Sequence, residues 1–354
     1  MNCKSIFFVL PVLLISLTDM YGFSSSMLND EMTSYPDQTF ELYFSALFLQ
    51  PSTSNTHYAV EAMPLPIYSP SWSTFDLHPR YRFGFDVGGK AIIDDSGTHI
   101  MVHWEHFRSS SSASTQVSSE NMIGPFFEIG PDASPYNQAQ AEVRFHIDEV
   151  TVALSKFIDI GEQWTTNFFG GVSFVRIQQD LFSYFSNPAS TITRAIQTPI
   201  KFLGAGPQVG VDVAYTIFKQ LFLVGKMQAS LLVGSMKNHT AYASTSPILG
   251  LLGAASPNNQ STSIQKRMQV VPALQESIGL SYSFSSRCEQ LAITIGAGYQ
   301  AQIYLQALQS IDMGSEVDDV PVGDASVGVF ARTFQRNLSN FALAGPYLTV
   351  SIGF

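Results

Sequence analysis

Apolar and polar residues alternate with a period of two along several long segments of this chain. The last segment, 340–354, carries an apolar residue at every second position near its end, at Leu348, Val350, Ile352 and Phe354. The segment 289–307 repeats the alternation over a longer stretch. A period of two predicts β-strands with one apolar face. These strands exceed the ~5 to 6 residues usual in soluble sheets and match the ~9 to 11 that cross a bilayer.

Ten segments of this kind are predicted, at 39–50, 80–90, 98–108, 138–159, 163–179, 200–217, 220–236, 266–285, 289–307 and 340–354. Most charges within them fall on the face opposite the apolar one, which is the apolar-out, polar-in pattern of an outer-membrane barrel. Two departures, Glu276 on the apolar face and a phase slip between Ile147 and Val150, are interpreted as β-bulges or strand ends. The sequence therefore predicts an all-β fold, a single closed antiparallel transmembrane β-barrel of about ten strands, with eight or twelve left open.

The connections between the predicted strands alternate between short and long. Short turns are expected at 94–97, 161–162, 218–220 and 285–288, and long polar segments at 51–79, 109–137, 180–199, 237–265 and 309–339. Short periplasmic turns and long extracellular loops are typical of such barrels, and an even strand number places both termini in the periplasm. The serine-rich tract within 109–119 and the acidic cluster within 309–339 are interpreted as solvated surface loops.

The N-terminal residues predict export from the cytoplasm. Lys4 precedes an apolar run that ends near Leu17, and its core of roughly 12 residues is too short to span a membrane but is typical of a secretory signal peptide. The signal peptide is assigned to residues 1–23, with cleavage between 22 and 26. A short segment, 24–38, and the barrel, 39–354, follow it.

The composition narrows the classes of function. The 354 residues carry a net charge of −10, which excludes the basic footprint of a nucleic-acid-binding protein. Only 13% of the residues are charged, against ~25% in typical soluble proteins, while 45% are hydrophobic. After Cys3 leaves with the signal peptide, Cys288 alone remains, so no disulfide can form within one molecule, and the role of Cys288 stays open. The scattered His residues give no zinc pattern, and no metal or cofactor is expected.

Motifs spread over most of the mature chain are similar to those of one known family. They are FELYFSALFLQPS from Phe40, YRFGFDVGG from Tyr81, HWEHF from His103, FLGAGPQVGVDVAY from Phe202 and GPYLTVSIGF from Gly345. In these motifs the chain resembles the pore-forming major outer membrane proteins of Legionella and its relatives. The resemblance implies an integral outer-membrane barrel with porin-like passive passage of small solutes, and it carries over no catalytic residue. Differences in loop length leave selectivity and any surface role open.

The candidate functional residues are charges expected to face the lumen: Arg80, Arg82, Asp86, Lys90, Asp212 and Lys226. Fixed charges set the selectivity of a water-filled pore. A barrel of about eight strands, however, is filled by its own side chains, and ten strands lie near that limit. The same charges could form internal salt bridges, so a structural or surface-binding (adhesin-like) barrel without conduction is the alternative function.

An enzymatic site is not expected. His99, His103 and Glu105 share one face of a strand, but a spacing of four residues separates the two imidazoles by roughly 13 Å, which favours a polar lumen wall over a metal site. An omptin-like outer-membrane enzyme is a minor alternative, although no Gly-x-Ser-x-Gly motif occurs.

The closing alternation from Tyr347 to Phe354 is interpreted as the signal by which the barrel assembly machinery recognises a substrate. The expected partners are therefore that machinery and outer-membrane lipid, with no nucleic acid. The expected location is the bacterial cell outer membrane. Whether the barrel forms an oligomer stays open.

We predict that Cys288 does not react with a membrane-impermeant maleimide on intact cells, because its turn is expected to face the periplasm. In a Cys288→Ser background, Ser112→Cys should react, because the segment 109–137 is expected outside. Labelling of Cys288 without labelling at position 112 would show that the barrel has the opposite orientation to the one predicted.

Overall fold

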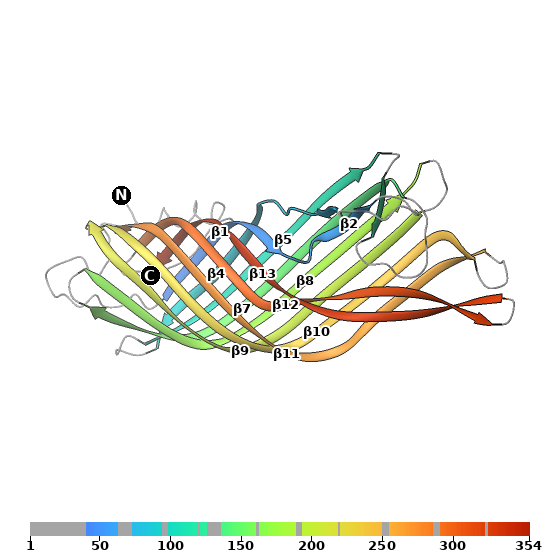
Figure 1. Ribbon diagram of the computed structural model, residues 1–354. Coiled ribbons are helices and arrows are strands. Elements are labelled where there is room, and N and C mark those ends of the chain that lie inside the picture. The colour runs from blue at the N-terminus through green and yellow to red at the C-terminus, as the bar shows by residue number, and fades with distance from the viewer. Residues whose placement is uncertain are drawn as a thin grey trace.

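Ten strands pair antiparallel around a closed ring in the computed structural model (Figure 1). They are β1 (Phe40–Thr53), β4 (Arg82–Ile92), β5 (Thr98–Gln116), β7 (Gln138–Ile160), β8 (Trp164–Ser186), β9 (Thr193–Phe218), β10 (Leu221–Leu249), β11 (Ala255–Ser285), β12 (Ala292–Val322) and β13 (Ala325–Gly353). Their order around the ring is β1-β13-β12-β11-β10-β9-β8-β7-β5-β4. The predicted fold class and strand number are confirmed.

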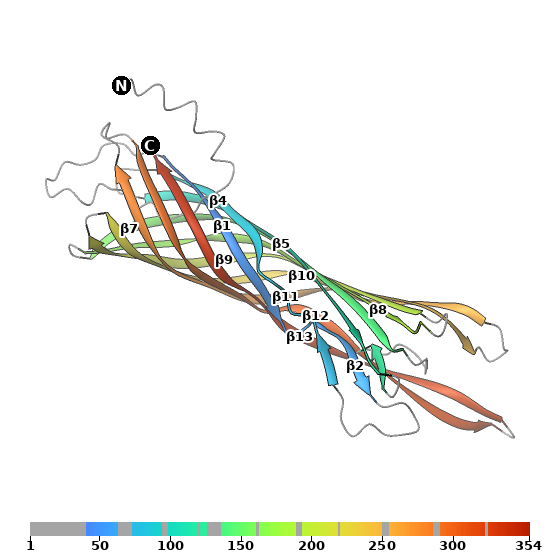
Figure 2. The ribbon, with the colours of Figure 1, turned by 90° about the horizontal axis from the view of Figure 1, so that it is seen from above.

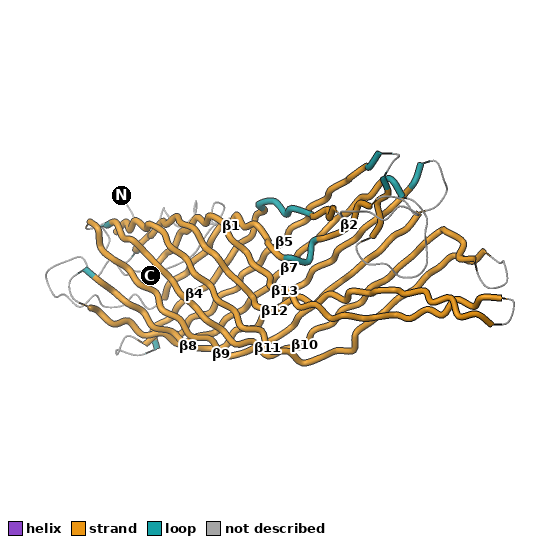
Figure 3. The backbone as a smooth tube through the Cα atoms, viewed as in Figure 1, coloured by secondary structure: helices purple, strands orange, loops and turns teal. Residues whose placement is uncertain are grey.

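The structure describes residues 40–62, 73–93, 98–118, 121–125, 136–160, 163–188, 193–218, 220–249, 255–285, 291–322 and 325–354. The expected signal peptide, the segment 24–38 and Cys288 lie outside these ranges. Every regular element within them is a strand (Figure 3). Among these residues, no helix has the length and apolar character needed to cross a membrane.

The ring closes between the first and the last strand. The Phe40 amide donates to the Phe354 carbonyl, and the Phe354 amide donates back to Phe40 at 2.9 Å. Further along, Leu42 faces Ile352 and Thr53 faces Phe341 in the same ladder. The start of β1 and the end of β13 therefore lie side by side at one end of the barrel (Figure 1).

A small second sheet lies at the opposite end of the barrel (Figure 2). Its strands β2 (His57–Ala62), β3 (Ser73–Asp76) and β6 (Met122–Pro125) pair in the order β3-β2-β6. Tyr58 and Ile123 of this sheet belong to the same buried apolar cluster as residues of the barrel wall. The sheet is thus packed against the barrel interior through its apolar face.

Strand length departs from the sequence-based expectation at the end that carries the small sheet. β10 and β11 pair out to Leu249 and Ala255, and β12 and β13 pair out to Val322 and Ala325. Both hairpins extend well past the rest of the barrel (Figure 1). The expectation of loops over most of 237–265 and 309–339 was wrong, because these polar segments continue the strand ladders in water. The serine-rich tract is likewise strand as far as Gln116, in regular register with β7.

An apolar belt surrounds the barrel near the end where β1 begins and β13 ends. Large hydrophobic side chains point outward and are exposed on all ten strands, among them Leu42, Val87, Val102, Val152, Phe168, Val209, Met227, Ile278, Ile295 and Leu348. Such a band is the lipid-facing surface of an outer-membrane barrel. We refer to these residues and their outward neighbours at the same depth as the apolar belt.

Beyond the belt the two faces of β7 exchange character. On β7, Val150 and Val152 are exposed and Glu149 is buried, whereas further out Ile147 is buried and His146 faces outward. The interpretation of the phase slip between Ile147 and Val150 as a β-bulge or strand end is therefore wrong. The pairing of β7 with β5 and β8 is continuous, and what changes is the environment. Outside the bilayer, water contacts the outer face, so the apolar side chains turn to the interior.

Glu276 also differs from its interpretation as a bulge or strand end. It lies within continuous pairing of β11 with β10 and β12, opposite Met227 and Ala301. Its side chain is exposed on the outward face. The alternation therefore placed Glu276 correctly on the outward face. The pairing around Glu276 is regular, so no β-bulge turns its carboxyl group away from that face.

Glycines on the inward face make room for aromatic side chains. A Cβ on Gly298 would lie 2.7 Å from Cζ of Tyr347, and one on Gly279 would lie 2.5 Å from its hydroxyl oxygen. The ring of Tyr347 therefore lies across a patch of bare backbone on β11 and β12. This contact fixes the last strand against its neighbours inside the barrel.

We predict that Ile295→Arg lowers the free energy of unfolding by ~2 to 4 kcal/mol, because it puts a charge on the lipid face. Ile295 is 41% exposed within the belt. Gln116→Arg, at an exposed position beyond the belt, should change it little. Reversible unfolding in lipid vesicles measures both, and equal tolerance would mean that Ile295 does not face hydrocarbon.

Candidate pore lumen

A layer of polar side chains fills the barrel interior at the depth of the apolar belt. We call it the polar layer, and its buried members include Asp86, Lys90, His103, Glu105, Glu149, Thr151, Asn167, Ser173, Gln208, Asp212, Lys226, Gln228 and Gln302. Each points inward because successive residues of a strand face opposite sides of the sheet, and the residues of the apolar belt occupy the outward positions. The layer therefore follows directly from the period-two pattern.

Glu149 is the centre of a hydrogen-bonded group within the polar layer. Its Oε1 accepts from the Ser173 hydroxyl at 2.7 Å. Its Oε2 accepts from the Tyr304 hydroxyl at 2.6 Å and from Gln302 Nε2 at 3.2 Å. These contacts join β7, β8 and β12 across the lumen. A carboxylate with three donors is strongly held, since hydrogen bonds to charged groups are the strong ones.

A second group surrounds Asp212. Asn167 Nδ2 donates to its Oδ2 at 3.1 Å, and Lys226 is its direct cross-strand neighbour on β10. The ammonium of Lys226 also lies 5.6 Å from the centre of the Phe169 ring. Opposite charges thus face each other across adjacent strands in the lumen.

The remaining charges of the layer lie on β1, β4 and β5. His103 Nδ1 is 3.4 Å from Asp86 Oδ1. Lys90 Nζ is 3.9 Å from Glu41 Oε2, a loose contact near the end of the barrel where the termini pair. Glu105 is buried with Asp86 and Glu149 as like-charged neighbours. Carboxyl groups therefore outnumber cations in this part of the described interior.

Apolar side chains lie within the depth of the polar layer and beyond it. Smaller apolar groups within its depth and toward the end where β1 begins include Tyr43, Phe222, Met101 and Phe169. Toward the small sheet lies a larger set, which we call the apolar plug: Leu47, Phe107, Phe145, Ile147, Val175, Ile177, Phe202, Leu232, Val271, Phe341 and Leu343. Phe145 and Phe341 meet across the lumen with ring centres 5.4 Å apart. The plug lies in the part of the barrel interior toward the small sheet.

The structure separates the six candidate lumen charges into two groups. Asp86, Lys90, Asp212 and Lys226 are buried in the polar layer. Arg80 precedes β4, Arg82 is its first residue, and both are exposed. The Arg82 guanidinium donates to the Ser110 carbonyl at 3.4 Å. The alternation predicted that Arg80 and Arg82 face the lumen, but at this end of β4 the barrel wall does not enclose their side chains.

Three central residues were not among the candidates. On their strands, alternate positions face the lumen, and these positions include Glu149, Gln302 and Tyr304. The alternation in the sequence could therefore have identified them. Glu149 was obscured by the exchange of faces next to it, and Tyr304 precedes an irregularity at which β12 shifts register and Gln306 has a φ of 56°. His103 and Glu105, interpreted as lumen wall, are both buried in the interior.

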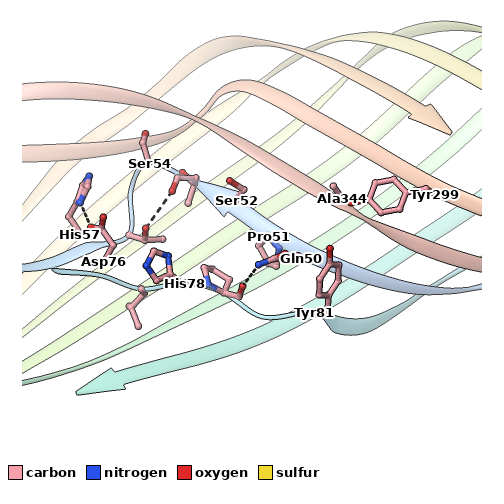
Figure 4. A pocket seen from close by; sticks show the side chains of 14 residues that line it. Gln50, Pro51, Ser52, Ser54, His57, Asp76, His78, Tyr81, Tyr299 and Ala344 are labelled. Carbon is pink, nitrogen blue, oxygen red and sulfur yellow. Dashed lines mark hydrogen bonds and ion pairs between the residues drawn. The ribbon is translucent and has the colours of Figure 1, made fainter. Parts of the chain in front are cut away.

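A pocket of about 460 Å³ opens at the outer rim, where β1 leaves the barrel and residues 77–81 return to it (Figure 4). Gln50 Nε2 donates to the Pro79 carbonyl at 2.7 Å across it. His57 of β2 forms an ion pair with Asp76 of β3, which ties the small sheet together. The pocket is a polar recess at the edge of the small sheet, separate from the polar layer.

A model of the family described as the Legionella pneumophila major outer membrane protein precursor matches residues 34–354. The chain belongs to this family. The match covers nearly the whole chain, including all ten barrel strands, so the location in the bacterial outer membrane follows for this Legionella-type barrel. No curated protein sequence matches it.

Solved barrels resemble the chain at very low sequence identity. The outer membrane protease OmpT from Escherichia coli matches at 8% identity and a TM-score of 0.39, over 89% of this chain and 97% of that one. The Pseudomonas putida toluene transporter TodX matches at 7% and 0.36, over 90% and 91%. The translocator domain of the autotransporter NalP from Neisseria meningitidis matches at 11% and 0.32, over 90% and 89%. At these values the matches say nothing about activity.

We predict that Glu149→Ala lowers the free energy of unfolding by ~1 to 3 kcal/mol, because it leaves the hydroxyls of Ser173 and Tyr304 without their acceptor. Glu142→Ala on the same strand is the control. Glu142 is half-buried outside the bilayer and contacts Arg144 at 2.7 Å, so its loss should have little effect. Urea unfolding followed by tryptophan fluorescence compares them, and equal stabilities would show that the Glu149 contacts are not formed.

Proposed function

We propose that this barrel is a narrow, cation-preferring pore for small solutes, hydrated at the polar layer and closed at the apolar plug in this conformation. The observation that carries the proposal is the polar layer itself. A barrel that served only as a membrane anchor has no need of a buried band of charges, because interior positions of small barrels can be filled by side chains of any well-packed kind.

The hydrogen bonding of the layer supports its hydration. Within the described residues, Glu105 Oε1, Gln208 Nε2 and Asp212 Oδ1 are buried and have no hydrogen-bond partner. A buried polar atom without a partner costs ~1 to 3 kcal/mol, so such atoms in proteins are generally paired with water. We therefore infer that water occupies part of the lumen beside these atoms.

The charge balance supports a preference for cations. Asp86, Glu149 and Asp212 contribute three carboxyl groups, against the two ammonium groups of Lys90 and Lys226 and the imidazole of His103. Fixed carboxylates along a pore lower the energy of a passing cation and raise that of an anion. We therefore expect small cations and neutral solutes to pass more readily than anions.

The apolar plug supports a gated pore. A constriction lined by aromatic and aliphatic side chains excludes water and ions until it widens. Because Tyr58 and Ile123 of the small sheet pack against the plug, displacement of that sheet is the movement that would open the path. No catalytic residue is assigned in this proposal.

A second function, surface binding without conduction, is favoured by one observation. The β10–β11 and β12–β13 hairpins extend beyond the barrel as paired strands (Figure 1). Rigid hairpins of this kind suit contact with other molecules at the cell surface. We also propose that the barrel assembly machinery recognises the last strand, in which Tyr347 is inward and Phe354 is exposed at the end.

We predict stepwise conductance in planar lipid bilayers with the purified barrel. Asp212→Asn should shift the reversal potential in a salt gradient toward anions, because it removes a lumen carboxylate. Lys226→Gln should shift it the other way. Glu142→Gln, outside the bilayer, should leave it unchanged.

The plug gives a separate expectation for the same recordings. Phe145→Ala together with Phe341→Ala should raise the open probability or the unit conductance, because the two rings meet across the lumen. A silent bilayer with correctly folded wild-type and plug variant, checked by heat-modifiable mobility on gels, would contradict the pore and support surface binding.

A further inference from the structure

Four basic side chains gather on the outward face of β5, β7 and β8, just beyond the apolar belt. They surround one carboxylate, and we call this set the basic cluster: His106, Arg108, His146, Arg176 and Asp148. The strand register brings them together. His106 faces Asp148 on β7, which faces Arg176 on β8, and Arg108 faces His146 in the next outward row.

Asp148 contacts both imidazoles, and its contact with His106 is a hydrogen bond. His106 Nδ1 lies 2.7 Å from Asp148 Oδ1, and His146 Nε2 lies 2.9 Å from Oδ2. The guanidinium of Arg176 donates to Gln178 Oε1 at 2.9 Å, so it is oriented along the same outward surface. Arg108 is exposed. The cluster is therefore an ordered set of donors that faces out of the barrel.

The net charge of the basic cluster is positive even though Asp148 belongs to it. Burial lowers the pKa of His146, and the charges of Arg108 and Arg176 lower it further, against the opposing effect of Asp148. Burial would raise the pKa of Asp148, but the hydrogen bond from His106 and the nearby cations hold it below its usual value. Two guanidiniums face one carboxylate even when both imidazoles are neutral.

The depth of the cluster identifies the headgroup region of the outer leaflet. The next row toward the periplasm consists of Trp104, Val150 and Phe174, of which Phe174 is 53% exposed. On β4, Phe85 faces His106 with ring centres 5.2 Å apart. Aromatic side chains mark the two interfaces of an outer-membrane barrel. The basic cluster thus begins where hydrocarbon ends.

We propose that the basic cluster binds a phosphate group of the phosphorylated glycolipid of the outer leaflet, lipid A, whose acyl chains lie over Trp104 and Phe174. Guanidinium groups match phosphate oxygens in charge and in bidentate geometry. The adjoining aromatic surface provides for the chains. The proposal is independent of whether the barrel conducts.

A divalent metal is the competing ligand for the same side chains. One donor atom each from His106, His146 and Asp148 lies within 4.8 Å of the others. Arg108 and Arg176 would repel a divalent cation at this position and attract an anion. The charge of the surroundings therefore favours phosphate.

The test uses the purified full barrel in detergent and compares bisphosphorylated lipid A with the same lipid after removal of its phosphates, by native mass spectrometry. Wild type should bind the phosphorylated form at least about tenfold more tightly, as expected for one charged hydrogen-bonded contact. The double variant Arg108→Gln, Arg176→Gln should lose this difference. Lys156→Gln, on the same face of β7 at the other end of the belt, should keep it.

The outcomes distinguish three ligands for the basic cluster: the phosphate of the lipid, free inorganic phosphate and a divalent metal. Retained preference in the double variant would overturn the proposal, and so would competition by inorganic phosphate at an affinity equal to that of the lipid. Stabilisation by ZnCl2 that is lost in His106→Ala, in a protein indifferent to lipid phosphate, would assign a metal site instead. If the Gln variant does not fold, the double variant Arg108→Lys, Arg176→Lys is used in its place. It should bind the phosphorylated lipid more weakly because lysine cannot make bidentate contacts. Unchanged affinity in this variant would also contradict the proposal.

Discussion

Main-chain hydrogen bonding inside hydrocarbon is the constraint from which the rest of this structure follows. Lipid offers no partner to an amide or carbonyl, so a strand can cross only when both of its edges are paired. The mutual bonds between Phe40 and Phe354 remove the last free edge. Once the ring is closed, successive side chains must alternate between lipid and lumen. The apolar belt and the polar layer are two consequences of one ladder.

The same ladder continues past the bilayer, where its two faces meet different surroundings. Water replaces lipid on the outer face, so Arg176 and His146 are favoured there, while Ile147 and Ile177 gain from turning inward. Burial of one such aliphatic side chain contributes ~1.5 to 3 kcal/mol. The outer half of the barrel is thus built like a soluble protein with an apolar core. The half of the barrel within the bilayer has the opposite arrangement, with apolar side chains outside and polar side chains inside.

Sequence reasoning recovered the features that depend on the period of two. All ten strands were located, and Asp86, Lys90, Asp212 and Lys226 were placed on the inward face, where they are buried. The sequence-based prediction failed beyond the apolar belt, where the strands continue with a period of two but their outer face contacts water instead of lipid. Polar composition beyond the belt was interpreted as loops at 237–265 and 309–339, although water-exposed strands are equally polar. Contacts such as that between Glu149 and Tyr304, 155 residues apart, depend on curvature and register that no single strand encodes.

The ladder that joins β1 to β13 also has a kinetic consequence. Its partners stand at the two ends of the part of the chain that the structure describes, so the loop they close is longer than that of any other strand pair in the ring. Pairings of such large sequence separation are slow to form. Until the final residues have crossed the inner membrane, the edge of β1 and the growing greasy surface have no permanent partner, and such intermediates are prone to aggregate. The rate at which the C-terminal strand is delivered, rather than the stability of the finished barrel, should then govern how much protein reaches the cell surface.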